Sequence, residues 1–149
     1  MPSSKKRKLK VVLDTNIWVS ALIWGGKPAE IIKADEYGKF SIFISEEIIM
    51  EISRVLTYAK IAKIYEAEGL PRDQLIEAVL KIAKLAKVTK KVKAVFAHPA
   101  DDKVIECALA AKADYIVSGD KHILELTSYK KTRILSVNEF LSIIEEKRN

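Results

Sequence analysis

Short apolar runs alternate with amphipathic stretches along this chain, and the alternation predicts strands that alternate with helices. Runs typical of buried parallel strands lie at 10–14, 40–44, 113–117 and 133–136. A further, outer strand is expected at 88–95. Apolar residues recur at helical spacing in the segments between them, which predicts helices over 15–24, 28–38, 45–56, 58–68, 72–87 and 137–144, one after Asp102 and a short one after Asp120.

This order of elements predicts the fold class. Strands joined by helices form right-handed crossovers and a mainly parallel sheet with helices on both faces. We therefore expect an α/β protein with three layers, α/β/α, around a mainly parallel central sheet. The chain would form one domain over 10–144, with a basic N-terminal tail at 1–9 and a polar C-terminal tail at 145–149.

The charge of the chain is concentrated at its beginning. The 149 residues include 26 Lys and Arg against 20 Asp and Glu, a net charge of +6. Five of the basic residues lie in the first ten positions, so the rest of the chain is nearly neutral, with 21 basic against 20 acidic residues. The tail is either a phosphate-binding arm or a solvated terminus.

Composition excludes several classes of protein. With 49% hydrophobic and 31% charged residues the chain is typical of a globular protein, not of a disordered one. The single cysteine, Cys107, excludes an internal disulfide framework and a multi-cysteine metal site. No apolar run has the length of about 18 residues that a spanning helix needs, and the apolar run after the basic tail breaks at Asp14, too early for a secretory signal. We expect no membrane association and a cytoplasmic location.

Motifs of four other enzyme and nucleotide-binding classes are missing. A haloacid-dehalogenase phosphatase needs a second acid where Asn16 stands, and a P-loop is excluded by Pro28 after Gly26-Lys27. The chain has neither the Gly-x-Ser-x-Gly turn of serine hydrolases nor the Gly-x-Gly-x-x-Gly fingerprint of dinucleotide sites.

Carboxylates stand where the predicted strands and helices meet. Asp14 and Asp120 follow two buried strands, so the parallel arrangement brings them to one edge of the sheet. Glu51 lies at the border of an apolar helical stripe, and Asp101 and Asp102 open the helix before the 113–117 strand. Taken singly, each of these acids fits a helix cap or a solvated position equally well.

Together, these acids point to a metal site. Acids that meet at one edge repel each other unless a cation joins them. Oxygen ligands without His or Cys favour Mg²⁺ or Mn²⁺, and such ions can activate water and stabilise the leaving oxygen of a phosphodiester.

Four segments resemble, in order and spacing, the motifs of PIN-domain proteins. They are 11–16 (VVLDTN), 46–56 (EEIIMEISRVL), 99–108 (PADDKVIECA) and 113–121 (ADYIVSGDK). Each motif is weak alone, but the four in order are specific, and the resemblance covers the chain from about Lys10 to Ile144. The chain is most similar to the toxin branch of toxin–antitoxin pairs, the VapC-like ribonucleases.

The resemblance implies an Mg²⁺- or Mn²⁺-dependent endoribonuclease. In this family the metal-ligand and catalytic positions match Asp14, Glu51, Asp101 and Asp120. The third acid aligns with Asp101 in this branch and with Asp102 in others, so Asp102 stays an alternative ligand. Polar positions that orient the ligands by hydrogen bonds match Thr15, Asn16 and Ser118.

The resemblance also implies partners: an RNA substrate, a cognate antitoxin protein and a second copy of the chain in a homodimer. A housekeeping role in RNA processing is an alternative to the toxin role. The main alternative from another class is a PIN-like module that binds RNA or protein without cutting it, although a cluster of acids facing phosphates argues against it.

Two lysines and two tryptophans have two interpretations each. Lys103 and Lys121 flank the acids, where they either contact phosphate or are solvated helix residues. Trp18 and Trp24 either stack on bases or belong to the core or a dimer interface. His98 stands where related sequences often have an acid, and the sequence favours a surface position for it.

Overall fold

A six-stranded sheet lies at the centre of the computed structural model, which describes residues 8–35, 38, 40–92 and 101–148. The strand order is β3-β2-β1-β4-β6-β5. All neighbouring pairs are parallel except β5 and β6, which are antiparallel. The strands are β1 (Leu9–Leu13), β2 (Phe40–Ile44), β3 (Lys84–Leu85), β4 (Tyr115–Val117), β5 (Ser128–Tyr129) and β6 (Thr132–Leu135). The predicted α/β class with a mainly parallel sheet is confirmed.

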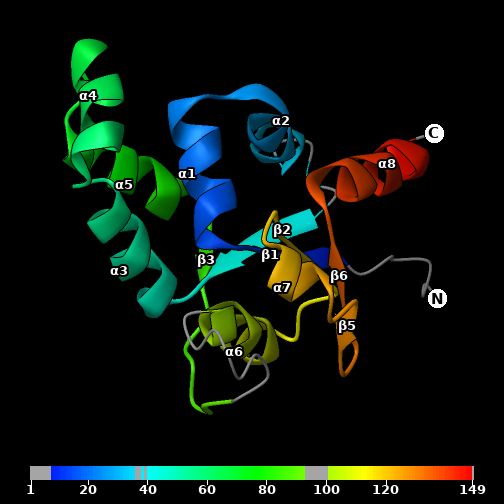
Figure 1. Cartoon of the computed structure of the whole chain (residues 1–149). Helices are drawn as coiled ribbons and strands as arrows, with labels where there is room; N and C mark the ends of the chain where they lie inside the picture. The colour runs from blue at the N-terminus through cyan, green and yellow to red at the C-terminus, as the bar shows by residue number, and fades with distance from the viewer. Residues whose placement is uncertain (1–7, 36–37, 39, 93–100, 149) are drawn as a thin grey trace.

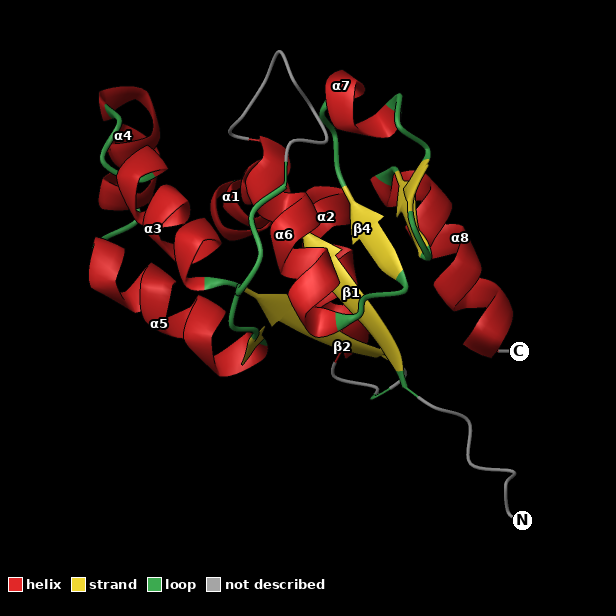
Figure 2. Cartoon of the chain, turned by 90° about the horizontal axis from the view of Figure 1, so that it is seen from below, coloured by secondary structure: helices red, strands yellow, loops and turns green. Residues whose placement is uncertain are grey.

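Helices cover both faces of this sheet (Figure 1). α6 packs on one face against β1, β2 and β4, whereas α8 packs against β6 and α2, and α2 packs against α1. Figure 2 shows α6 in front of the strands and α8 at their far side. The helices are α1 (Thr15–Ile23), α2 (Gly26–Asp35), α3 (Glu46–Val55), α4 (Ala59–Ala67), α5 (Arg72–Ile82), α6 (Asp102–Ala111), α7 (Lys121–Leu124) and α8 (Val137–Arg148).

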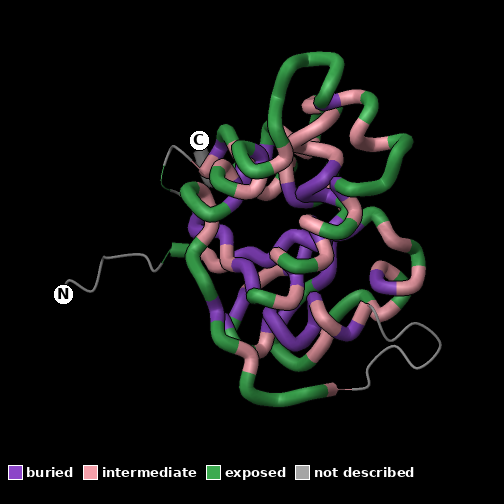
Figure 3. The backbone as a smooth tube through the Cα atoms, turned by 90° about the vertical axis from the view of Figure 1, so that its left-hand side faces the viewer, coloured by how far each residue is buried: buried purple, intermediate pink, exposed green. Residues whose placement is uncertain are grey.

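The core follows from the apolar runs of the central strands. Val11, Val12 and Leu13 of β1 are fully buried, because helices cover both faces of this strand. Buried segments of the chain gather in the middle of the molecule in Figure 3. β1 therefore holds its last residue and the one that follows it, Asp14, in a fixed position at the edge of the sheet.

α8 is anchored by an aromatic cluster. The Phe140 ring is fully buried and meets Phe40 of β2 edge-to-face, with ring centres 5.2 Å apart. Tyr115 of β4 contacts the same ring at 5.8 Å. Ser136 and Glu139 cap the start of the helix: the Ser136 N–H donates to the Glu139 carboxylate, and the Glu139 N–H donates to the Ser136 hydroxyl.

Two predicted boundaries between residues 72 and 95 are wrong. α5 ends at Ile82 instead of near Lys87, and the edge strand is β3 at Lys84–Leu85. Residues 88–92 are not in a strand, and 93–95 lie outside the described residues. The two residues of β3 pair with Phe43 and Ile44 of β2. Just after the strand, the Ala86 N–H donates a hydrogen bond to the Ile44 carbonyl at 2.8 Å.

Other differences are smaller. α2 begins at Gly26, two residues before Pro28, and α8 runs to Arg148, beyond the expected end near Ile144. β6 corresponds to the strand predicted at 133–136, but β5 and its hairpin with β6 were not predicted. Positions 1–7 of the basic tail and His98 lie outside the described residues. Within the described part of the chain, every helix is too short or too polar to span a membrane.

Candidate functional site

A pocket of about 250 Å³ opens at the carboxyl edge of the sheet, between the ends of β1 and β4 and the helices α3 and α6. Four of the acids expected to act together line it, and they come from four separate segments of the chain. They are Asp14, Glu51, Asp101 and Asp120. The structure therefore brings together the carboxylates that the sequence places far apart.

Asp14 is the most enclosed of these acids, with 6% of its surface exposed. It is the N-cap of α1, and its Oδ1 accepts a hydrogen bond from the Ile17 N–H at 2.9 Å. Its Oδ2 accepts a hydrogen bond from the Ser118 hydroxyl. These bonds fix the carboxylate at the edge of the pocket.

The surroundings of Asp14 disfavour its charge. Burial raises the pKa of Asp14 from 3.8 to about 6, although the hydrogen bonds from Ser118 and Ile17 lower it. The negative charges of Asp120 and Asp101 raise it further. A bound cation would reverse this effect, because it stabilises the ionised carboxylates.

Ser118 links Asp14 to Asp120 across the loop after β4. Its hydroxyl donates to Asp14 and accepts from the Asp120 N–H at 3.0 Å. Asp120 is the N-cap of α7, where its Oδ1 accepts from the N–H groups of His122 at 2.7 Å and Ile123 at 3.3 Å. Its other carboxylate oxygen is not needed for the cap and can serve the pocket.

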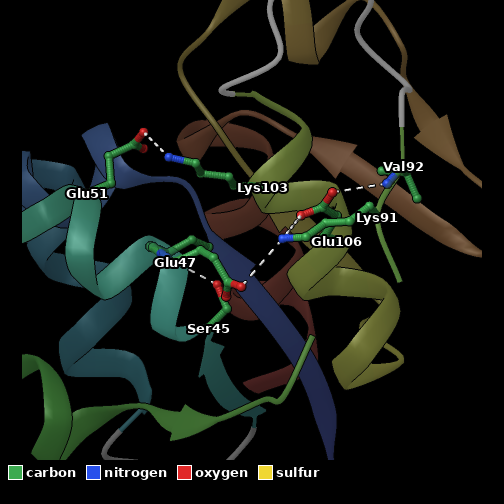
Figure 4. A network of polar contacts seen from close by, with 8 residues as sticks. Ser45, Glu47, Glu51, Lys91, Val92, Lys103 and Glu106 are labelled. Atoms are coloured by element: carbon green, nitrogen blue, oxygen red, sulfur yellow. Dashed lines mark hydrogen bonds and ion pairs between the residues drawn. The ribbon is translucent and has the colours of Figure 1, made fainter. Parts of the chain in front are cut away.

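Glu51 reaches the pocket from α3, and two cations and a hydroxyl hold it. The Thr15 hydroxyl donates to its Oε1. The Lys103 Nζ lies 3.4 Å from its Oε2, a contact that Figure 4 shows, and an Arg54 guanidinium nitrogen lies 3.5 Å from the same oxygen. The Glu51 side chain is only 15% exposed, and a charge with so little contact with water needs partners. The lysine, the arginine and the hydroxyl supply them.

The structure separates the two adjacent aspartates of the third motif. Asp101 lies just before α6 and lines the pocket. Asp102 is the first residue of α6, is buried, and does not line the pocket. Of the polar residues expected beside the acids, Thr15 and Asn16 line the pocket, and Ser118 contacts it through Asp14.

The two lysines have different positions. Lys103 lines the acidic pocket, whereas Lys121 lines a neighbouring hollow that Asn16 and Asp120 also line. Trp18 is fully buried in the core, so it is not available to stack on bases, while Trp24 is 60% exposed.

Arg54 and Tyr58 also line the pocket, although neither was among the site residues expected from the sequence. Helical spacing carried the signal: Arg54 follows Glu51 by three residues and therefore lies on the same side of α3. Tyr58 lies one further turn along, just past the end of α3. Arg54 could therefore have been found by extending the acidic side of this helix, whereas Tyr58 lies beyond its end.

The donor set suits a hard divalent cation, since all four candidate ligands offer carboxylate oxygens. Among the described residues, no three acids, histidines or cysteines lie close enough together to hold one ion as they stand. Mg²⁺ does not require three, because it is commonly bound by one or two carboxylates with water and phosphate oxygens completing its octahedron. The pocket thus fits such an ion through Asp14 and its neighbours.

Comparison with known proteins gives a family and a fold. The sequence profile of the PIN domain matches residues 10–122. Among curated proteins, no sequence matches the chain. Among solved structures, a chain of VapBC2 from Rickettsia felis, crystallised with a DNA fragment from the promoter, superposes with a TM-score of 0.60 at 12% identity. This match covers 86% of the present chain and 98% of that chain. At this identity it shows a shared fold and nothing more.

Proposed function

The chain belongs to the PIN domain family, and on this basis we propose that it is an endoribonuclease that hydrolyses RNA phosphodiester bonds with Mg²⁺ or Mn²⁺. One observation carries the proposal: four carboxylates from four segments line one open pocket at the carboxyl edge of a parallel sheet. Such edges are where α/β folds place their ligands. A pocket lined with acids attracts RNA poorly unless a cation lies between them and the phosphates.

In this proposal Asp14, Asp101 and Asp120 hold the metal, and Glu51 joins them when it leaves its contact with Lys103. Asp102 is the less favoured candidate for the third ligand, since it is buried and does not line the pocket. The bound ion would supply an activated water and would stabilise the leaving oxygen of the phosphodiester. Ser118 and Thr15 orient Asp14 and Glu51 by the hydrogen bonds described above.

Cations of the chain position the substrate in this scheme. Lys103 and Arg54 lie in the pocket and offer charged donors to phosphate oxygens. Lys121 and the exposed Asn16 border the neighbouring hollow, where the next nucleotide of the RNA would lie. These roles require no movement of the sheet, only of side chains at its edge.

The test is cleavage of RNA by the purified protein. We expect products with Mn²⁺ and none with EDTA, because water activation needs the ion. Asp14→Asn and Asp120→Asn should each lower the rate about a hundredfold or more, as loss of a ligand does. Asp73→Asn is the matched control, since Asp73 is exposed in the first turn of α5, away from the pocket.

Cleavage that persists in EDTA and in both pocket variants would overturn the proposal. RNA binding without cleavage in any metal would favour the alternative of a PIN-like module that only binds. The contacts of Glu51 with Lys103 and Arg54 are the observation that favours this alternative, because they compensate the acid without a metal.

We further propose that the chain acts as the toxin of a toxin–antitoxin pair in the cytoplasm, partnered by an antitoxin and by a second copy of itself. Family membership and the structural likeness to VapBC2 support the antitoxin, and an RNA-processing role is the alternative. Co-expression that restores growth inhibited by the protein alone, and loss of inhibition by Asp14→Asn, would support the toxin role.

A further inference from the structure

Lysines line two hollows beside α6, away from the acidic pocket. The two hollows adjoin and share Leu109, Lys112 and Lys130 in their linings. The six lysines that line them, here called the lysine surface, are Lys10, Lys87, Lys90, Lys112, Lys130 and Lys131. Because the chain after its first ten residues is nearly neutral, this is a strong local concentration of charge.

The fold fixes the position of the lysine surface relative to the pocket. Lys10 lies near the start of β1, and Lys130 and Lys131 lie in the turn between β5 and β6, just before the start of β6. Lys112 directly follows α6, whose first turn borders the acidic pocket. The 10 residues of this helix span about 15 Å, so a polymer of a few nucleotides along α6 would reach from one region to the other.

The acids in this region are already engaged within the chain. Glu106, which is buried, accepts from the Val92 N–H at 3.0 Å and lies 3.7 Å from the Lys91 Nζ (Figure 4). Asp114 accepts from the Lys10 N–H at 2.8 Å. Most of the lysines, by contrast, are exposed, Lys112, Lys130 and Lys131 among them. Both acids line the hollows, but six lysines against two acids leave the lining with a net positive charge.

The lining of the larger hollow also suits a nucleotide. The hollow has a volume of about 500 Å³ and is lined by the apolar residues Ala108, Leu109 and Ala113 together with lysines. Apolar side chains beside cations match a nucleotide, whose base is apolar on its face and whose phosphate is anionic. Exposed Lys8, just before β1, adds a further cation close to Lys10.

We propose that the lysine surface binds the phosphate backbone of single-stranded RNA outside the acidic pocket. This inference rests on the proposed function because it assumes that the polymer bound is RNA. It concerns binding only and does not require cleavage. RNA held there along α6 is kept beside the acidic pocket, which repels phosphates when no cation occupies it.

The test is the affinity of the full chain for a labelled single-stranded RNA of about 20 nucleotides, longer than the stretch that one domain typically covers. It is measured by fluorescence anisotropy in EDTA at several salt concentrations, with Asp14→Asn as the parent so that no RNA is cut. The test variant carries Lys112→Gln, Lys130→Gln and Lys131→Gln. The control carries the same change at three exposed lysines on α2 and α4: Lys33, Lys60 and Lys63.

We expect the test variant to bind about tenfold or more weakly and its salt slope to fall by about two, as the loss of three phosphate contacts predicts. The control should stay within about twofold of the parent. Equal affinities in the two variants, or weaker binding with an unchanged salt slope, would overturn the proposal. Stronger loss for duplex DNA than for the RNA would overturn the assignment to single-stranded RNA. Thermal unfolding of both variants checks that each folds.

Failure of the proposed function leaves this result intact, because no metal and no cleavage enter the measurement. A protein that binds RNA through the lysine surface and never cuts it would support this inference and overturn the nuclease. If the protein cleaves RNA and the test variant binds RNA as tightly as the parent, the nuclease would be supported and this inference overturned.

Discussion

Asp14 is a buried acid whose ionised form the folded chain disfavours. Burial holds its pKa near 6, well above the value of 3.8 for an exposed aspartate, so near neutral pH the metal-free protein contains a charge that the fold stabilises poorly. The neighbouring acids Asp120 and Asp101 add repulsion. A carboxylate with this cost is typical of a site that gains its stability from a ligand.

The first prediction concerns the pH dependence of stability without metal. Between about pH 4 and 6 the folded state keeps a proton on Asp14 that the unfolded state has lost, so the free energy of unfolding falls as pH rises. The fall amounts to at most about 3 kcal/mol. Chemical unfolding of the wild type and of Asp14→Asn in EDTA isolates it, because the variant lacks the titrating group. A difference between the two proteins that does not change with pH would contradict this account.

The second prediction concerns Lys103, whose ammonium competes with a metal for Glu51. Lys103→Gln should tighten the binding of Mn²⁺ by about two- to fivefold, the size expected for a partly exposed ion pair. Lys103→Arg keeps the charge and should bind Mn²⁺ like the wild type. Isothermal titration measures both, and weaker binding by Lys103→Gln would show that Glu51 does not serve the metal.

The sequence predicted which acids would meet at the edge of the sheet, but not how each is held. Asp14, Glu51 and Asp120 could be found because strand ends and helical stripes have fixed geometry. The sequence alone does not decide whether Asp101 or Asp102 is the third ligand. Side chains of neighbouring helical residues point about 100° apart, and the first residue of a helix can be predicted only to within one or two positions. The hydrogen bond from Ser118 to Asp14 depends on the pairing of β1 with β4, which is a long-range contact.

At the scale of elements, α8 closes the sheet on the face opposite α6, and one ring anchors it. The third prediction is that Phe140→Ala lowers the free energy of unfolding by about 3–5 kcal/mol, since it leaves a cavity between Phe40 and Tyr115. Phe140→Leu should cost less than half as much because it fills most of the space. Urea unfolding followed by circular dichroism measures both. A loss below about 1 kcal/mol for Phe140→Ala would mean that this ring does not anchor the helix.

The elements that sequence failed to place are the shortest ones. β3 and β5 have two residues each, so neither contains an alternating or apolar run. The helical pattern of α5 also continues through Leu85 and Ala86, although pairing with β2 makes this stretch extended. β1 and α3 were predicted within one residue, because their apolar pattern ends where the element ends, whereas the ends of the longer α5 and α8 were not.

At the scale of the whole molecule, the fold separates two kinds of charge. Carboxylates meet at the carboxyl edge of the sheet, whereas lysines line two hollows beside α6, away from the acidic pocket. This arrangement explains how a chain with a net charge of +6 can contain an acidic pocket. It also fits a protein that binds an anionic polymer with one region and a cation with the other.

The central claim is that Asp14, Asp120 and their neighbours in the pocket bind a divalent cation. Electron paramagnetic resonance of free Mn²⁺, titrated with the wild type, Asp14→Asn, Asp120→Asn and the control Asp73→Asn, tests it most directly. We predict saturable binding by the wild type and the control, and affinity reduced about tenfold or more in both pocket variants. Equal binding by all four proteins, or none by the wild type, would contradict the account.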